Sequence, residues 1–409
     1  MGDGVFTKKE KTILLLLVLI HFCLIVDFMI LMPLGPMFMR VFNVGASAFG
    51  LLVAAFTLFA GLSGLGGAFF IDRYDRKVFL VRVLVGFMIS NLVCGFATNF
   101  EYLVVARAVT GFFAGVCGSL LITIVSDTIQ IERRGTALGI LMSAFALASI
   151  LGVPLALFLS NKVGWQSPFF MLALFSVAMI VGVKRWMPEM TEHLIVKNEA
   201  HQRPQMFLRV VLQNKEYWGG IAFMAVLILG HFTINPFLFT SIVNNGGLPE
   251  SQLPMVYLAA GVASLLSAIG FGKLTDKLGR TRTFRWALLA SLLPIYLVTN
   301  VFSNSVVLVV LLVSLFFVLM GGRLTPAMTL ITSVARPEDR GRYLSCIVSV
   351  QHLATAGASL LAGAILVKGE DGKLLNLPSV GLTAMAFSAV AFILSVRIYR
   401  NSIDSHCNH

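Results

Sequence analysis

Charged residues are scarce in this sequence. They make up 12% of its 409 residues, whereas soluble globular domains average about 25%. Hydrophobic residues supply 57% of the chain, and the mean hydropathy is +0.89. A soluble domain needs far more charge on its surface than this chain can provide. The composition therefore excludes a soluble globular protein and predicts an integral membrane protein.

Cysteine and histidine are also sparse. The five cysteines form no CxxC pair, and the seven histidines are scattered along the chain. This pattern excludes a disulfide framework and a zinc site of the usual ligand spacing. No nucleophile constellation and no phosphate-binding glycine loop is evident. The sequence therefore predicts no metal, no cofactor and no enzymatic activity.

Long apolar stretches are what the chain has in abundance. Each is close to the ~20 residues that a helix needs to cross a bilayer, and too uniformly apolar for a barrel strand. We expect an all-α integral membrane protein with twelve transmembrane helices. The first stretch is too long for a removable signal peptide and lacks a small-x-small cleavage site. The predicted spans are roughly 12–39, 47–71, 78–98, 102–126, 136–159, 168–187, 218–242, 253–272, 286–303, 306–333, 343–367 and 379–397.

The net charge of +12 is explained by the predicted topology. With both termini in the cytoplasm, nearly all lysines and arginines fall on cytoplasmic segments, as the positive-inside rule requires. The exceptions are four residues on external loops, Arg40, Lys162, Lys368 and Lys373, and two inside spans, Arg107 and Arg323. The basic excess therefore indicates orientation in a membrane and not a nucleic-acid partner.

A polar stretch at 188–217 separates the predicted spans into two sets of six. The loop Asp72-Arg-Tyr-Asp-Arg76 after the second span matches Asp276-Lys-Leu-Gly-Arg280 after the eighth, 204 positions later. We therefore expect an N-terminal six-helix bundle at 1–187 and a C-terminal one at 218–409, joined by a cytoplasmic linker at 188–217. In such repeats the substrate path lies at the interface of the two bundles.

Three motifs resemble those of one transporter family. The stretch GKLTDKLGRTR at 272–282 resembles the GxLxDRxGR signature of the major facilitator superfamily, and AFFIDRYDRK at 68–77 is a looser copy. The stretch RAVTGFFAG at 107–115 is similar to the RxxxGxxxG motif of the same superfamily. In span five, Gly152-Val153-Pro154 is similar to part of the antiporter motif of its twelve-helix drug:proton antiporters. The resemblance implies the major facilitator fold, with two pseudo-symmetric bundles, and proton-coupled export.

The resemblance also implies a gate on the cytoplasmic side. Asp72 matches an acid that faces the N-terminal end of helix eleven, where the helix dipole favours negative charge. Arg76 matches an arginine that pairs with an acid at the inner end of helix four, here Asp127. Such contacts would close the inner side; the alternative is an ordinary solvated surface. The residues expected to form the matching turn in the second half are Gly272, Asp276, Gly279 and Arg280.

Asp27 is the one acid placed deep in a predicted span. A charge at the bilayer centre costs at least ~2.5–3.5 kcal/mol. Asp27 lies ~22 Å from the inner surface and Arg107 lies ~9 Å from the outer surface, at ~1.5 Å per residue. The two charges therefore fall at nearly the same level of a ~30 Å core, and we expect an ion pair. It either couples protons to substrate, because a buried carboxyl beside an arginine titrates with small rearrangements, or only holds two helices together.

Four further polar residues are candidates for the substrate cavity. His231 lies 204 positions after Asp27, and is either a second proton site or a neutral hydrogen-bonded histidine. Asn235 would lie one turn further on the same helical face. Arg323 has no deep carboxylate in its half, which suggests an anionic substrate group, a backbone cage or snorkelling to the interface. Asn91 is a weaker candidate of the same kind.

These features favour a proton-coupled exporter of a small amphipathic compound or metabolite. Two alternatives stay open: a facilitator or proton symporter for an organic anion, and a membrane receptor that transports nothing. The expected partners are a small-molecule substrate, protons and the lipid bilayer, with the protein acting as a monomer. Short loops favour a bacterial inner membrane, with both termini cytoplasmic.

Overall fold

The computed structural model describes residues 6–70, 74–130, 133–190, 214–332, 334–335 and 340–407. Within these residues the chain is helical apart from one hairpin of two short strands. The elements up to residue 190 are α1 Lys8–Ile30, α2 Gly35–Val41, α3 Ala46–Phe70, α4 Arg76–Gly95, α5 Phe100–Thr128, α6 Arg134–Met142, α7 Ala144–Leu147, a π-helical turn Ala148–Gly152, α8 Val153–Val163 and α9 Ser167–Trp186.

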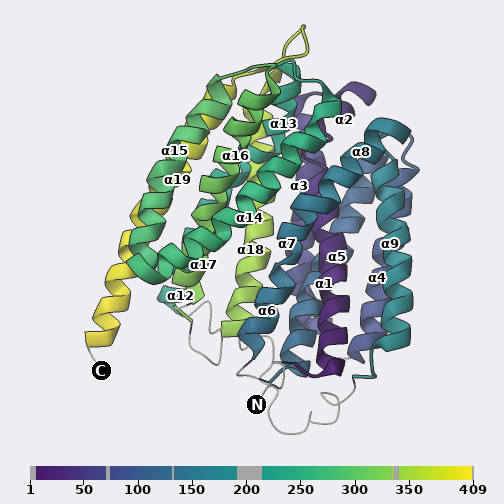
Figure 1. Ribbon diagram of the computed structural model, residues 1–409, viewed down its shortest axis with the longest axis vertical. Helices are drawn as coiled ribbons and strands as arrows, with labels where there is room; N and C mark the ends of the chain where they lie inside the picture. Colours follow the sequence, from purple (N-terminus) through teal and green to yellow (C-terminus); the bar gives the residue numbers. More distant parts are fainter. Residues whose placement is uncertain are drawn as a thin grey trace. The chain divides into compact units, whose positions relative to one another are not determined.

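The elements after residue 214 follow the same pattern of long helices. They are α12 Lys215–Phe232, α13 Asn235–Asn244, a 3₁₀ turn Glu250–Gln252, α14 Leu253–Leu278, α15 Arg280–Asn300, α16 Val306–Gly322, α17 Leu324–Thr332, α18 Arg340–Ile365, β1 Val367–Lys368, β2 Leu374–Leu375 and α19 Leu377–Cys407. The antiparallel hairpin β1–β2 connects α18 to α19 (Figure 1).

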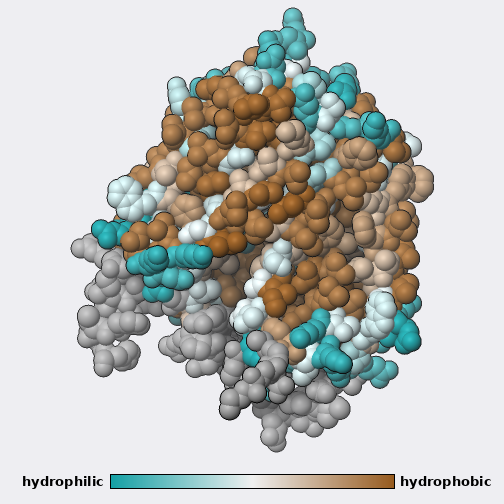
Figure 2. Space-filling model, viewed as in Figure 1, coloured by the Kyte–Doolittle hydropathy of each residue, from teal (hydrophilic) through white to brown (hydrophobic). Residues whose placement is uncertain are grey.

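Eleven helical segments of the described chain are long and apolar enough to cross a membrane. The one predicted span that is not among these eleven is the ninth, 286–303, which corresponds to α15; this helix is less apolar because its first turns carry Arg280, Arg282 and Arg285. Figure 2 shows hydrophobic side chains covering the helical surfaces, with hydrophilic residues gathered at the helix ends. Soluble monomers rarely expose apolar patches of this extent, so the surface fits a lipid environment.

Four of the spans are interrupted at prolines, which lack the backbone N–H that an α-helix needs. The first span breaks between α1 and α2, at residues 31–34, which include Pro33. The fifth contains the π-helical turn Ala148–Gly152, which ends two residues before Pro154. The seventh breaks between α12 and α13, ahead of Pro236, and the tenth between α16 and α17, ahead of Pro326 (Figure 1). Interruptions of this kind place side chains and free backbone groups in the interior of a bundle.

The chain forms two compact units. The first holds the described residues of Met1–Ile30 and Ala55–Pro204, and the second holds those of Leu31–Ala54 and Gln205–His409. The boundaries therefore fall at the end of α1 and inside α3. The predicted linker 188–217 lies largely outside the described residues, so that boundary stays a prediction.

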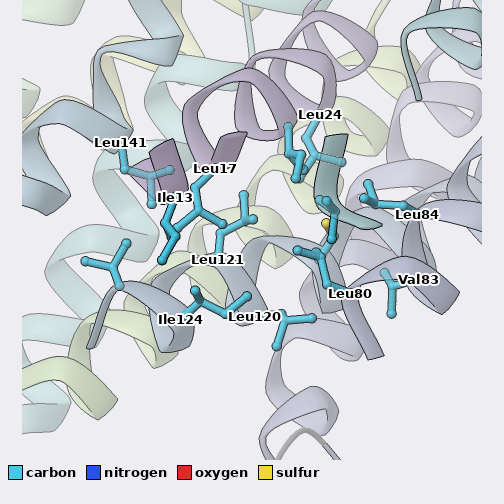
Figure 3. Packing of buried hydrophobic residues seen from close by; sticks show 14 of the residues in the cluster. Ile13, Leu17, Leu24, Leu80, Val83, Leu84, Leu120, Leu121, Ile124 and Leu141 are labelled. Carbon is cyan, nitrogen blue, oxygen red and sulfur yellow. The ribbon is translucent and has the colours of Figure 1, made fainter. Parts of the chain in front are cut away.

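Each unit has its own apolar core. In the first unit, leucines and isoleucines of α1, α4, α5 and α6 interlock (Figure 3). Figure 3 labels Ile13, Leu17, Leu24, Leu80, Val83, Leu84, Leu120, Leu121, Ile124 and Leu141. In the second unit, α12 and α15 meet through Phe223 and Phe284, whose ring centres are 5.1 Å apart. In lipid, such van der Waals packing is a main source of helix association.

Residues 31–54 pack closely on the later helices of the second unit. The Phe49 and Phe237 rings meet edge to face at 5.6 Å. A side chain at Gly50 would collide with the backbone oxygen of Ser359. Arg40 and Glu250 form a two-pronged ion pair, with N–O distances of 2.5 and 3.0 Å. The part of the first two spans beyond Ile30 and before Ala55 is thus built into the second unit.

Candidate functional site

The ion pair expected between spans one and four is present. The Arg107 Nη1 on α5 donates to Asp27 Oδ1 on α1 at 2.7 Å, and its Nη2 donates to the Asp27 carbonyl oxygen at 3.2 Å. Both side chains are completely buried. Breaking such a pair by removing one partner typically costs 3–5 kcal/mol, because the other charge stays buried alone.

Aromatic rings enclose the guanidinium of this pair. The Arg107 Cζ lies 4.3 Å from the centre of the Phe56 ring and 5.7 Å from that of Phe169. A desolvated cation over an aromatic face gains about 2 kcal/mol. Among the described residues, Asp27 Oδ2 and Arg107 Nε have no hydrogen-bond partner. Arg107 is therefore held partly by rings, and one carboxylate oxygen of Asp27 makes no hydrogen bond within the described residues.

The glycines of the RxxxGxxxG motif bring α3 against α5. A side chain at Gly111 would collide with the backbone oxygen of Phe56, and one at Gly115 with that of Ala60. Small residues at such positions let membrane helices approach to backbone contact. This approach places the Phe56 ring over Arg107, so the motif arranges the environment of the ion pair.

The antiporter-motif helix packs on α1 next to Asp27. A side chain at Gly152 would collide with the Val26 side chain and come within 3.0 Å of Phe22. The π-helical turn that precedes Pro154 carries Ser149, whose Oγ donates to the sulfur of Met29 at 3.8 Å. π-Helical turns often mark functional sites. Gly152 thus lets span five pack closely on α1 beside the buried carboxylate, and Pro154 follows the π-helical turn in the same span.

Sequence reasoning missed His21 on α1. Its Nδ1 lies 3.0 Å from the carbonyl oxygen of Leu141 at the end of α6, and its ring meets Phe145 edge to face. The signal was available, since His21 is a polar residue in an otherwise apolar stretch near Asp27. His21 links α1 to the start of the distorted part of span five.

Asn91 lies on α4 and does not join the ion pair. Its side chain is completely buried and donates to the Phe87 carbonyl oxygen of its own helix at 3.1 Å. Its Oδ1 has no partner among the described residues. Asn91 is therefore placed as a buried polar group with one open acceptor, and its role in the cavity stays a prediction.

Arg323 lies in the second unit at the interruption between α16 and α17. It is completely buried. Its Nη1 donates to Ser388 Oγ on α19 at 3.0 Å and to Ser291 Oγ on α15 at 3.3 Å. Nε and Nη2 have no partner among the described residues. The guanidinium does not snorkel to an interface and has hydroxyl partners on one side only.

His231 and Asn235 flank the interruption between α12 and α13. The His231 ring lies 4.9 Å from Phe232 and 6.5 Å from Phe316, centre to centre, and close enough to Arg323 to interact electrostatically. His231 Nδ1 and Asn235 Oδ1 have no partner in the described part of the chain. The prediction that both lie on one continuous helical face is wrong, because residues 233–234 break the helix before Pro236.

Of the predicted gate residues in the first unit, the structure describes Arg76 and Asp127. Arg76 Nε donates to Asp127 Oδ2 at 3.0 Å, joining the start of α4 to the end of α5 within the first unit. Asp72 lies outside the described residues. Asp75, which replaces a family glycine, accepts from Val78 N at 2.9 Å and from Met190 N at 2.8 Å. The substituted residue therefore caps α4 and ties it to the chain that follows α9.

Replacing Asp75 is expected to lower the stability of the first unit, and alanine should lower it more than asparagine does. Asp75→Ala removes both acceptors and should cost about 1–2 kcal/mol, as the loss of a helix cap does. Asp75→Asn keeps one carbonyl oxygen for the Val78 N–H and should cost less. The thermal midpoints of the purified variants should fall in the order wild type, Asp75→Asn, Asp75→Ala. Equal midpoints for Asp75→Ala and wild type would contradict the capping role.

The second gate motif forms a turn at one residue only. Gly279 has φ +82° and joins α14 directly to α15. A positive φ favours glycine over all other residues. The prediction that Gly272, Asp276, Gly279 and Arg280 form the turn together is wrong in detail. Gly272 and Asp276 lie within α14, Asp276 is exposed, and Arg280 begins α15.

Comparison with known proteins agrees with this architecture. The family model described as Major Facilitator Superfamily matches residues 17–240 and 221–405. Multidrug resistance protein 2 of Bacillus subtilis is 25% identical, covering 79% of this chain and 80% of its own length. A probable sugar efflux transporter of Mannheimia succiniciproducens is 22% identical, covering 57% of each chain.

Solved transporters share the fold at low sequence identity. The nucleoside transporter NupG superposes with a TM-score of 0.76 at 12% identity, over 96% of this chain and 100% of its own. A bacterial homolog of the human lysosomal transporter Spinster gives 0.72 at 16% identity, over 96% and 97%. The predicted helical membrane fold is confirmed, and the relatives are transporters and not enzymes. With a family model matching nearly its whole length, the chain belongs to the major facilitator superfamily of multi-pass membrane transporters.

Proposed function

We propose that this protein is a secondary active transporter that exports a small amphipathic compound or metabolite in exchange for protons, by alternating access. The observation that carries the proposal is the completely buried pair of Asp27 and Arg107. Ionisable residues inside a membrane span mark ion pathways and proton relays. The names of two relatives, a multidrug resistance protein and a sugar efflux transporter, support the export direction.

The pair offers two states that differ by one proton. In the paired state Asp27 is a carboxylate bound by Arg107. Burial favours the neutral acid and the guanidinium favours the anion, so a small change in their separation changes the protonation. A proton on Oδ2 of Asp27, which has no hydrogen-bond partner among the described residues, would weaken the ion pair with Arg107. Arg107 would keep its contact with the Phe56 ring. Proton binding thereby becomes a change in helix contacts.

That change occurs beside the first two of the three points where the chain passes from one unit to the other. Asp27 lies three residues before Ile30, where the first unit ends, and Phe56 follows Ala55, where it resumes. Alternating access requires two units to change their relation around a substrate. A proton that alters the contact of Asp27, Arg107 and Phe56 therefore acts next to the first two of these connections at once.

The gate and the location belong to the same proposal. Arg76 and Asp127 stabilise the inner ends of α4 and α5, with Asp72 and the turn at Gly279 as the remaining gate elements. The excess of basic residues on one side supports cytoplasmic termini. We place the protein in a bacterial inner membrane as a monomer, with the cargo and protons as its partners.

Proton coupling is tested by the direction of gradient-driven uptake in liposomes. A radiolabelled compound that stabilises the purified protein in a thermal-shift screen serves as cargo, and protein-free liposomes correct for passive distribution. Exchange predicts accumulation when the lumen is acidic. Accumulation with an acidic exterior would indicate a symporter, equilibration without accumulation a facilitator, and no movement a receptor; each of these contradicts the proposal.

A further inference from the structure

Two nitrogens of the buried Arg323 guanidinium, Nε and Nη2, have no hydrogen-bond partner among the described residues. We infer that Arg323 binds a carboxylate group of the cargo, which makes the substrate class a small organic acid with an apolar body. This inference rests on the proposed transport function and specifies its substrate.

Three helices hold the guanidinium in one orientation. Arg323 follows Gly321 and Gly322 at the interruption caused by Pro326, which cannot donate to the preceding turn. Ser291 on α15 and Ser388 on α19 both accept from Nη1. The side chain is fully buried. It is thus fixed by its neighbours and not free to turn toward water.

The two open nitrogens form one edge of the guanidinium. Nη1 lies on the same side of the group as Cδ, so the serines occupy that side. Nε–H and the adjacent Nη2–H point in parallel, and neither has a partner among the described residues. Two parallel N–H groups match the two oxygens of a carboxylate and give a bidentate pair. An amine or a neutral alcohol cannot make this pair.

No described carboxylate of the second unit neutralises Arg323. Glu250 is paired with Arg40, and Asp371 is paired with Lys373 at the exposed hairpin. Glu370 in the same hairpin and Asp276 at the end of α14 are both exposed. In the first unit, by contrast, the buried Arg107 is neutralised by Asp27. A charge buried without a partner is costly in a low-dielectric interior. An anionic group on the cargo would offset that cost and gain affinity from it.

The surroundings of Arg323 favour an apolar body with a single negative charge. His231 interacts with Arg323 and lies beside the rings of Phe232 and Phe316. One guanidinium balances one carboxylate, whereas a phosphate ester of higher charge needs more cations or donors. An aromatic acid satisfies both requirements, so benzoate is a suitable probe.

Equilibrium binding to the purified full-length protein tests the inference. Benzoate and formate serve as carboxylates of different size, and benzamide, which has the shape of benzoate without its charge, is the control ligand. We expect both carboxylates to raise the thermal midpoint in a saturable way and benzamide to have no such effect. Calorimetric titration of benzoate gives the affinity for wild type and variants.

Two substitutions of Arg323 separate charge from shape. Arg323→Gln removes the charge, and Arg323→Lys keeps a charge but loses the fork; we expect each to weaken benzoate at least 10-fold. Arg282→Gln removes an exposed arginine from the same unit and should leave the affinity unchanged. Size-exclusion chromatography selects variants that are folded, and the lysine variant preserves the buried charge if the glutamine variant fails.

Saturable binding of benzoate that weakens in both Arg323 variants supports the inference. Wild-type affinity in Arg323→Lys, equal binding of benzamide and benzoate, or no stabilisation by either carboxylate overturns the inference. Binding is measured without a proton gradient, so a negative result leaves proton-coupled export standing. Failure of gradient-driven uptake, in turn, leaves the carboxylate site intact.

Discussion

Asp27→Asn is expected to abolish accumulation driven by a pH gradient. Asparagine has the size of aspartate but no titratable proton, so it cannot alternate between a carboxylate paired with Arg107 and a neutral acid. The net movement of cargo against its gradient should fall to the level of protein-free liposomes. Exchange of labelled for unlabelled cargo needs no net proton turnover and should persist in the same liposomes.

The structure also predicts a stability cost that must be separated from coupling. Asp27→Asn leaves Arg107 buried without its counter-ion, which typically costs 3–5 kcal/mol. The double variant Asp27→Asn/Arg107→Gln removes both charges and should recover most of the lost thermal midpoint. It should not recover proton-driven accumulation. If the double variant recovered both the thermal midpoint and the proton-driven accumulation, the pair would be only structural.

A matched acid on the same helix pair controls for charge. Glu101 is exposed in the first turn of α5, and Glu101→Gln should retain accumulation and thermal midpoint. If Asp27→Asn accumulates cargo as wild type does, the proton-coupling proposal fails whatever its stability.

The features that sequence reasoning predicted correctly are those that depend on long windows or on rarity. Apolar runs of ~20 residues define the spans because the bilayer fixes their length. Asp27 was identifiable because a lone acid in such a run needs a partner, and Arg107 was the one basic residue at a similar depth in the first half. Both inferences use distance along a helix, which the sequence supplies directly.

The missed features depend on tertiary packing. The serines that hold Arg323 lie 32 and 65 positions away, and hydroxyls in spans usually bond to their own helix. The contact of Asp75 with Met190 was hidden because this donor is 115 positions away. The break after His231 is a local effect of Pro236, and only the shared face of His231 and Asn235 was wrong, because it assumed a continuous helix. Packing of residues 31–54 on the second unit has no local signal.

Gly111→Ala is expected to destabilise the first unit and displace the ring over Arg107. The added methyl would collide with the backbone oxygen of Phe56, and overpacking of a tight contact costs about 1–3 kcal/mol. Backbone cannot move aside as a flexible side chain can, so α3 must shift away from α5. Both the thermal midpoint and the gradient-driven accumulation should fall.

Gly118→Ala on the same helix isolates the steric effect. A methyl at Gly118 meets nothing within 4 Å, and alanine is favoured over glycine in a helix by about 1 kcal/mol. This variant should equal or exceed wild type in thermal midpoint and should transport normally. Because helix propensity favours both substitutions equally, the difference between them measures the contact with Phe56 alone. Equal behaviour of the two variants would show that the close approach of α3 and α5 is not needed, and the motif would then lose its role in positioning the ion pair.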